Sequence, residues 1–303
     1  MKKFLLKVLL FFAFVVILDF VFGFVFSWLR IHAKGGSTAN CEYIANYANE
    51  KLIILGSSRA AHHYIPHIIE DSLGVSCYNC GEEGNGVVLA YGRLKMLIDR
   101  YKPKLILYEI TPGYDFGTIE PNTKFLGYLR PYYNKDGIKE IFADFDDDLY
   151  SLKMVSKMYQ NTSRLLPNIV DNIVFRDNMK GYSPLYGKMN ITNYSPDKPK
   201  EMEIDSLKLN YVEKVIELAQ NNNIPIIFMI SPRYGGQSSI DNYEPALHLC
   251  EKHDVRVCNY INCPDIANNE VYFQDAGHMN HEGAFAYTNL LIKEILNNKN
   301  LYE

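Results

Sequence analysis

Beyond its first thirty residues, the chain repeats one order of hydrophobic and polar positions: a short apolar run, then a longer segment with apolar residues every three or four positions. Apolar runs separated by helical segments are typical of parallel strands that are buried on both faces. The runs predict strands at residues 51–56, 75–79, 104–111, 224–231 and 255–260. The longer segments predict helices at residues 60–73, 87–101, 204–221, 243–253 and 281–297. The pattern therefore predicts an α/β fold, a three-layer α/β/α sandwich with about five parallel strands.

The alternation stops in the middle of the chain. Residues 112–203 are rich in Tyr, Asn, Asp and Pro, with short helical patterns at residues 138–145 and 149–159. Long insertions into α/β units usually serve binding. We interpret residues 112–203 as an inserted, partly helical subdomain that shapes or covers a site.

The N-terminus has a different pattern, because one apolar run extends from Val8 to Leu29 with only Asp19 as a charged residue. A helix needs about 20 such residues to cross a bilayer, whereas the apolar region of a cleaved signal peptide has roughly 7–15. The lysines that precede the run favour a cytoplasmic N-terminus. We therefore expect a single-pass protein with an anchor at residues 1–35 and an extracytoplasmic domain at 36–303. Residues 36–50 are expected to be a linker. Asp19 is expected to be tolerated in the span or bound to a partner.

Charge and cysteine content narrow the class of protein. A net charge of -4 argues against a nucleic-acid partner, which would require a basic surface. Six cysteines fit an exported domain with a disulfide or two. Cys77 and Cys80 form a C-x-x-C pair, but their place in a predicted strand favours packing over a redox or metal role.

Two polar motifs follow predicted strands. The sequence GSSR at residues 56–59 ends the first strand, and DAGH at residues 275–278 precedes the last helix. A serine here can simply cap a helix. A catalytic serine, however, needs a base, and the base needs an orienting group. Because ligands bind at the carboxyl ends of parallel strands, the motifs are placed to meet there.

Together these motifs resemble the blocks of the SGNH (GDSL-like) hydrolase superfamily. The resemblance covers residues 51–111 and 204–297 and implies a flavodoxin-like SGNH fold. It makes Ser58 the nucleophile, His278 the base and Asp275 the partner of the base.

A further segment, VSCYNCGEEGNG at residues 75–86, resembles the second block of the same family. In that block a glycine N–H helps to form the oxyanion hole, together with the N–H of the nucleophile. Gly84 aligns best with this glycine and Gly81 second, so the resemblance implies an oxyanion hole made by Ser58 with one of them.

The third family block departs from the pattern, because ITPGYD at residues 110–115 replaces the usual Gly-x-Asn-Asp. The asparagine that donates to the oxyanion is missing, and loss of one such donor typically costs about 10²–10³ in turnover. Arg59, next to the implied nucleophile, either binds an anionic substrate group or pairs with a carboxylate such as Glu82, Glu83 or Glu109. We favour the ion pair.

The resemblance implies a serine esterase that acts on acyl esters of a carbohydrate or an envelope polysaccharide. Two alternatives stay open: an O-acyltransferase that modifies an exported polysaccharide, and a catalytically silent assembly or binding protein. No metal or cofactor is expected. His63 and His67 share one predicted helix face, but no third ligand at a telling spacing accompanies them.

Overall fold

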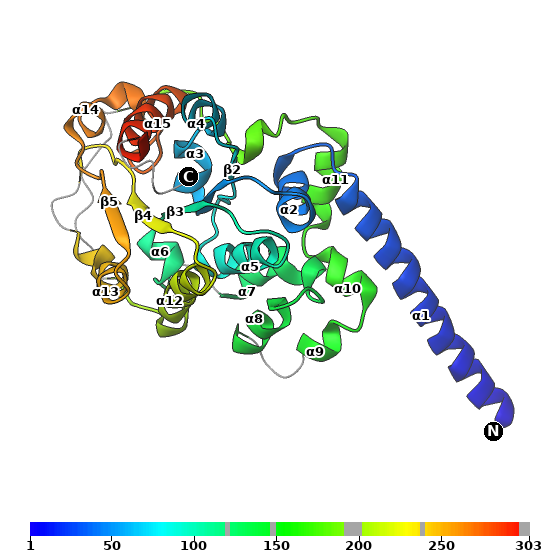
Figure 1. Ribbon diagram of the computed structural model, residues 1–303. Helices are drawn as coiled ribbons and strands as arrows, with labels where there is room; N and C mark the ends of the chain where they lie inside the picture. The colour runs from blue at the N-terminus through cyan, green and yellow to red at the C-terminus, as the bar shows by residue number, and fades with distance from the viewer. Residues whose placement is uncertain (119–121, 146–149, 191–201, 237–239, 297–303) are drawn as a thin grey trace.

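The computed structural model describes residues 1–118, 122–145, 150–190, 202–236 and 240–296 (Figure 1). Its centre is a sheet of five parallel strands in the order β2-β1-β3-β4-β5. The strands are β1 (Leu52–Gly56), β2 (Cys77–Asn79), β3 (Leu105–Glu109), β4 (Ile226–Ile230) and β5 (Arg256–Asn259). Each lies inside a run that the sequence pattern predicts, so all five predicted strands are confirmed.

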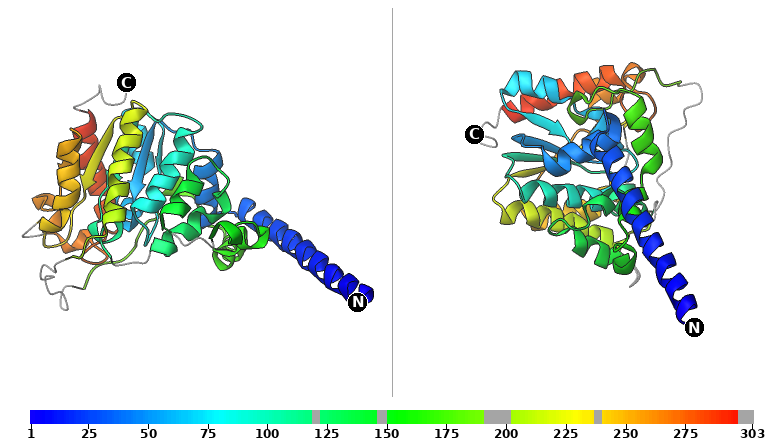
Figure 2. Two further views of the ribbon diagram at one scale, coloured as in Figure 1. Left: turned by 90° about the horizontal axis from the view of Figure 1, so that it is seen from below. Right: turned by 90° about the vertical axis from the view of Figure 1, so that its right-hand side faces the viewer.

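Helices cover both faces of this sheet, which confirms the three-layer sandwich (Figures 1 and 2). One face carries α5 (Val87–Ile98), α12 (Ser206–Asn221) and α13 (Glu244–Lys252). The other carries α3 (Ser58–His63), α4 (Pro66–Leu73), α14 (Pro264–Ala267) and α15 (His281–Leu296). Successive strand side chains point to opposite faces. In β1, Ile53 and Leu55 therefore join the first core, and Leu52 and Ile54 the second.

Three elements differ from the prediction. The helical pattern at residues 149–159 is divided into α9 (Tyr150–Lys153) and α10 (Lys157–Thr162). The helix expected at residues 60–73 is divided into α3 and α4, because Ile65 precedes Pro66 and is extended, as residues before proline usually are. The linker expected at residues 36–50 is wrong for most of its length, since α2 (Gly36–Asn46) forms there. Ile44 and Ala45 of α2 are buried in the same core as α5, which explains why this segment is helical.

The segment 112–203 is largely helical where the structure describes it. Its elements are α6 (Pro112–Asp115), α7 (Asn122–Leu129), η1 (Arg130–Tyr132), α8 (Ile138–Phe145), α9 (Tyr150–Lys153), α10 (Lys157–Thr162), α11 (Leu165–Ile173) and η2 (Met179–Gly181). Leu129 and Ile138 belong to the core that α5 covers, so α7 and α8 continue the sandwich. Two further short elements, η4 (Asp241–Tyr243) and η5 (Glu270–Tyr272), lie later in the chain.

Helix α1 (Lys2–Ile31) extends away from the sandwich (Figures 1 and 2). It has 30 residues and a mean hydropathy of 2.9, and is therefore long and apolar enough to cross a membrane. Its C-terminal part lies beside α10 and α11 (Figure 1).

All six cysteines have free thiols, so the expected disulfides are not formed. The C-x-x-C pair shows why. Cys77 lies in the core on one side of the sheet and Cys80 in the core on the other. Residues three apart on an extended chain point to opposite faces, so these two sulfur atoms cannot meet.

Candidate active site

The turn between β1 and α3 places Ser58 at the carboxyl edge of the sheet. Gly56 ends the strand with a φ of +140°, and a Cβ on it would lie 2.7 Å from the carbonyl oxygen of Glu109. Only glycine fits such a backbone at that distance. Ser57 then occupies the N-cap position without a side-chain cap hydrogen bond, and Ser58 is the first residue of the helix. Local backbone geometry thus explains why the strand ends on a glycine.

Ser58, His278 and Asp275 come together at this edge, from parts of the chain 220 residues apart. The hydroxyl of Ser58 lies 2.8 Å from Nε2 of His278. On the other side of the imidazole, Nδ1 lies 3.0 Å from both carboxylate oxygens of Asp275. The three side chains therefore have the order of nucleophile, base and orienting carboxylate that acyl transfer requires.

The partners of His278 determine its tautomer. An ionised carboxylate only accepts hydrogen bonds, so Nδ1 carries the proton and donates it to Asp275. Nε2 is then the acceptor for the Ser58 hydroxyl. Partial burial by itself would raise the pKa of Asp275, but His278 and the N–H groups of Gly277 and His278 lower that pKa below its ordinary value. Asp275 is therefore a carboxylate at neutral pH.

The two glycines predicted for the oxyanion hole differ in their contacts. The N–H of Gly81 donates to Oδ1 of Asn79 at 2.9 Å, so it is already occupied. Gly81 instead lets the loop approach α3, since a Cβ on it would lie 2.5 Å from the backbone nitrogen of Ala61. Gly84 has a φ of +66° in the turn that follows. Of the two, only Gly84 stays a candidate donor.

Asp115 stabilises residues 110–115, the segment that replaces the third family block. Its carboxylate accepts hydrogen bonds from the N–H of Thr111 at 2.6 Å and the hydroxyl of Tyr108 at 2.9 Å. Complete burial outweighs these bonds and raises the pKa of Asp115 to about 7. The side chain of Thr111 accepts a hydrogen bond from Ser57 at 2.8 Å. This packing connects the end of β3 to the residue just before Ser58.

Arg59 is buried beneath the site and pairs with Glu109, as the favoured interpretation predicts. Its Nε lies 3.2 Å from Glu109, and the guanidinium also donates to the hydroxyl of Tyr243 at 3.0 Å and that of Ser231 at 2.9 Å. The Glu109 carboxylate also accepts hydrogen bonds from the Ser231 hydroxyl at 2.7 Å and from Tyr64. Burial raises the pKa of Glu109 above its ordinary value, and the charge of Arg59 together with the hydrogen bonds from Tyr64 and Ser231 opposes this rise. The ion pair occupies Arg59, and the substrate-binding role expected for it is not needed to explain its position.

His63 is a residue whose place in the site the sequence analysis missed. Its Nε2 accepts a hydrogen bond at 3.0 Å from the N–H of Met279, directly after His278. Its Nδ1 therefore carries the proton and donates to Ser231 at 2.7 Å. Burial first, and then the charge of Arg59, lower the pKa of His63 well below its ordinary value. The spacing to His67 gave no signal of this role, because His67 lies at the surface beside Glu70.

A cavity of about 580 Å³ opens beside Ser58 and His278. The segment from Thr111 to Tyr114 forms one wall, and Arg233 and Tyr243 lie on others. Among the described residues that line it, Met202 and Glu203 come from the end of the inserted segment. The end of the inserted segment therefore forms part of the cavity wall, which is consistent with its predicted role in shaping the site.

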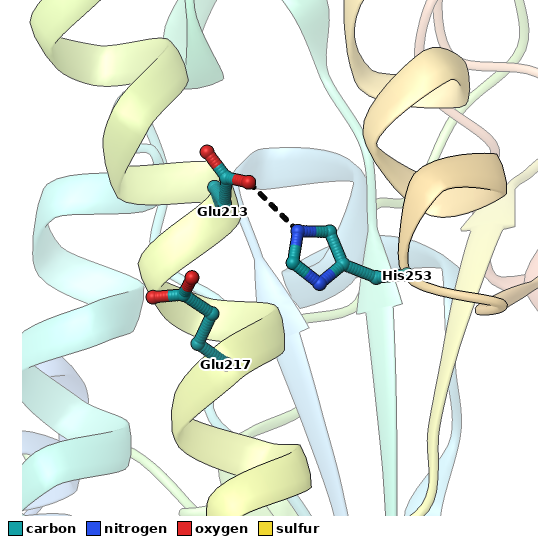
Figure 3. A group of neighbouring side chains, drawn as sticks. All are labelled: Glu213, Glu217 and His253. Carbon is teal, nitrogen blue, oxygen red and sulfur yellow. Dashed lines mark hydrogen bonds and ion pairs between the residues drawn. The ribbon is translucent and has the colours of Figure 1, made fainter.

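Among the described residues, a cluster outside the candidate active site has the residue types of a metal site. It consists of Glu213 and Glu217 on α12 and of His253, which follows α13 (Figure 3). The carboxylate of Glu213 already binds Nε2 of His253 at 2.7 Å and Nζ of Lys252 at 2.6 Å. A surface ion pair explains the cluster.

No family model matches the chain, and no curated protein matches it. Several solved structures are similar. A G-D-S-L family lipolytic protein from Desulfitobacterium hafniense has 9% identity and a TM-score of 0.39, with 80% of this chain and 98% of that chain covered. A GDSL-like lipase from Bacteroides thetaiotaomicron has 11% identity and a TM-score of 0.38, with 82% of this chain and 88% of that chain covered. An acylhydrolase from Bacteroides fragilis has 14% identity and a TM-score of 0.39, with 88% of this chain and 97% of that chain covered. These likenesses are distant, so the chemistry rests on the side chains of this chain.

Proposed function

We propose that this chain is a membrane-anchored serine esterase of the SGNH type, with Ser58 as nucleophile, His278 as base and Asp275 as orienting carboxylate. The observation that carries the proposal is the continuous set of hydrogen bonds from Ser58 through His278 to Asp275. A binding protein has no need of a serine hydroxyl held 2.8 Å from an imidazole nitrogen that lacks a proton.

In the proposed reaction, the Ser58 oxygen attacks the ester carbonyl while Nε2 of His278 takes its proton. Asp275 stabilises the imidazolium that forms. The same proton is then given to the leaving alcohol, and an acyl-enzyme remains on Ser58. Water, activated by His278, attacks the acyl group and restores the free serine.

The oxyanion of the tetrahedral intermediate needs donors, and the usual asparagine is absent. We assign this role to the backbone N–H groups of Ser58 and Gly84. Ser58 is the first residue of α3, so its N–H has no partner inside the helix. With one donor fewer than the family pattern, turnover is expected to be about 10²–10³ lower than with three donors.

The cavity supports a substrate larger than a simple acetyl ester. Its volume of about 580 Å³ is in the range of ligand sites and leaves room for a sugar-sized alcohol beside the acyl group. Tyr114, Asn242 and Tyr243 supply aromatic faces and polar atoms that suit a carbohydrate. The substrate class we propose is an acyl ester of an envelope polysaccharide. In this proposal α1 anchors the enzyme in the membrane and the catalytic domain lies outside the cytoplasm.

The nucleophile is tested most directly with a fluorophosphonate probe, which reacts with activated serines whatever the natural substrate is. The full-length chain in detergent is expected to be labelled, and the Ser58→Ala variant is not. Ser57→Ala is the matched control, because the Ser57 hydroxyl bonds to Thr111 and not to His278. Labelling that persists in Ser58→Ala, or its absence from the wild type, would refute the proposed mechanism.

The same cavity is open enough to admit a second alcohol, which favours O-acyl transfer as the alternative outcome for the acyl-enzyme. Release of the alcohol from a chromogenic acetyl ester is measured with and without an added oligosaccharide. An esterase is expected to give equal rates. A transferase is expected to release the alcohol faster with the acceptor and to yield an acetylated sugar.

A further inference from the structure

Large apolar side chains face outward on the helices that surround the C-terminal part of α1. Leu166, Ile173 and Phe175 have exposed fractions of 75%, 76% and 76%. Other exposed apolar side chains of the same segment are Leu152, Val155, Met158, Val170 and Val174. We refer to these eight side chains as the outer apolar surface; they lie on α9, α10 and α11, in the connection between α9 and α10, and in the residues after α11.

Helix α11 is inverted with respect to a helix on a water-soluble protein. Its polar residues Asn168 and Asp171 are buried, with exposed fractions of 2% and 3%, whereas Leu166 and Ile173 face outward. Thr38 of α2 satisfies these two buried side chains of α11: its N–H donates to Asp171 at 3.1 Å and its hydroxyl donates to Asn168 at 3.0 Å. A surface helix in water has the opposite arrangement. The inversion indicates that the medium outside α11 is apolar.

The N-terminus of helix α10 is bound to α1 at Asp19, in the middle of the apolar span. The Asp19 carboxylate accepts hydrogen bonds from the N–H groups of Lys157 at 2.8 Å and Met158 at 3.2 Å, and from the hydroxyl of Ser156. One turn further along α1, Gly23 allows close approach, because a Cβ there would lie 2.6 Å from Cβ of Lys157. Small residues at such contacts are typical of helices that pack in membranes.

This attachment sets the depth of α10 if α1 spans the bilayer. The apolar part of α1 begins after Lys7, and about 20 residues cross the hydrocarbon core, which therefore ends near Trp28. Asp19 lies nine residues before that end, which is about two and a half turns and roughly 14 Å at 1.5 Å per residue. The start of α10 is consequently in the outer leaflet, close to the midplane of a hydrocarbon core about 30 Å thick.

We propose that the outer apolar surface is embedded in the outer leaflet beside α1, so that its partner is the acyl layer of the lipid bilayer. This inference rests on the proposed membrane anchoring of α1. It also explains Asp19: a carboxylate at membrane depth is tolerated where protein groups satisfy it, and α10 supplies those groups. The protein is then held by one span and by a monotopic surface formed by the inserted segment.

Tryptophan quenching by brominated acyl chains tests this depth, because the chain contains a single tryptophan, Trp28. Three variants of the full-length chain, each with Trp28→Phe, are placed in vesicles of brominated phosphatidylcholine. Phe14→Trp reports the insertion of α1, Phe175→Trp reports the outer apolar surface, and Phe285→Trp reports α15 on the opposite part of the sandwich (Figure 1). All three positions are exposed phenylalanines, so each change conserves an aromatic side chain.

We expect the tryptophans of Phe14→Trp and Phe175→Trp to lose most of their emission, and that of Phe285→Trp to keep it. Ile173→Trp, at a second exposed position, repeats the measurement should Phe175→Trp fold poorly. Quenching in Phe14→Trp without quenching at either outer position would overturn the embedded surface and leave the anchor intact, as expected if another protein or water covers this surface. Absence of quenching in Phe14→Trp itself would remove the anchor and, with it, this inference.

Discussion

Two regions of the molecule bury polar groups, and they do so in opposite surroundings. Beneath Ser58, Arg59 and Glu109 form an ion pair inside a sandwich whose other interior residues are mainly apolar. In α11, Asn168 and Asp171 point inward while the large apolar residues point outward. In the sandwich, buried polar groups are few, and the pair of Arg59 and Glu109 supports the active site. In α9–α11, polar side chains face inward and apolar side chains face outward, because the proposed exterior is lipid.

The comparison shows that the pattern of polar and apolar residues predicts which face of a helix is buried only when the surrounding medium, water or lipid, is known. The buried groups named here have polar partners: Arg59 pairs with Glu109, and Thr38 donates to Asn168 and Asp171. The difference lies in which residues are left to face outward. Each of the following variants removes one polar group from one of the regions, in order of decreasing expected effect.

Replacing Glu109 should have the largest effect on stability. Glu109→Leu leaves the buried guanidinium of Arg59 without its counter-charge, and breaking a buried ion pair in this way costs about 3–5 kcal/mol. Chemical unfolding of the full-length chain in detergent measures the loss. Glu213→Gln, which breaks a partly exposed pair with Lys252, serves as control and should cost less than about 1 kcal/mol. Equal, small losses of unfolding free energy in both variants would mean that the ion pair of Arg59 and Glu109 does not contribute to stability.

Asp115 should make the stability of the sandwich depend on pH. Its pKa is raised to about 7 in the folded protein, above the ordinary value of 3.8. Between these values the folded state binds a proton that the unfolded state does not, so stability rises as pH falls below about 7 and is lost as pH rises through it. From pH 7 to pH 5 the gain is roughly 2 to 3 kcal/mol, at about 1.4 kcal/mol per unit.

Asp115→Asn isolates this effect, because asparagine keeps an acceptor for the N–H of Thr111 and does not titrate. The difference in unfolding free energy between wild type and variant should grow in favour of the wild type as pH is lowered from 8 to 5. Other titrating groups cancel in this difference. A difference that stays flat over the range would show that Asp115 is ionised throughout.

Asp19 allows the second region to be tested in the same way. Asp19→Leu removes the acceptor for Lys157 and Met158 and leaves their N–H groups unpaired, which should cost about 2 kcal/mol. Asp19→Asn keeps one acceptor oxygen and should lose less. Thermal unfolding in detergent compares the two variants. If leucine is tolerated as well as asparagine, the attachment of α10 to α1 depends on packing at Gly23 alone.

The sandwich was predictable because its strands are continuous apolar runs, and such runs have few alternatives to burial in a parallel sheet. The motifs at residues 56–59 and 275–278 were readable for a similar reason: each is local, and both lie at the end of the sheet where ligands bind. The resemblance to the SGNH hydrolases then selected Ser58, Asp275 and His278 within these motifs, and the structure brings the three side chains together.

What the sequence did not reveal depends on distant partners. Residues 36–46 look like a polar linker, and only their contacts with α5 and α11 make them a helix. The stripe of Leu166, Val170 and Ile173 follows a helical period, but a period does not state whether the stripe faces a core or a membrane. Likewise, nothing adjacent to His63 in the sequence indicates that Ser231 and Met279 will be its partners.

His63 provides the smallest and most specific of these tests. It does not line the cavity, but it holds the N–H of Met279 and thereby the backbone that carries His278. His63→Leu leaves that N–H without its acceptor, and a small displacement of the base should lower kcat by about tenfold to hundredfold with little change in KM. His63→Gln reaches the same N–H with its amide oxygen and should recover part of kcat. Loss of folded enzyme alone would also lower the apparent kcat at unchanged KM, so kcat is calculated per active site titrated with the fluorophosphonate probe. A kcat per active site that equals wild type in His63→Leu, or a glutamine variant no better than leucine, would show that His63 supports the fold and does not position the base.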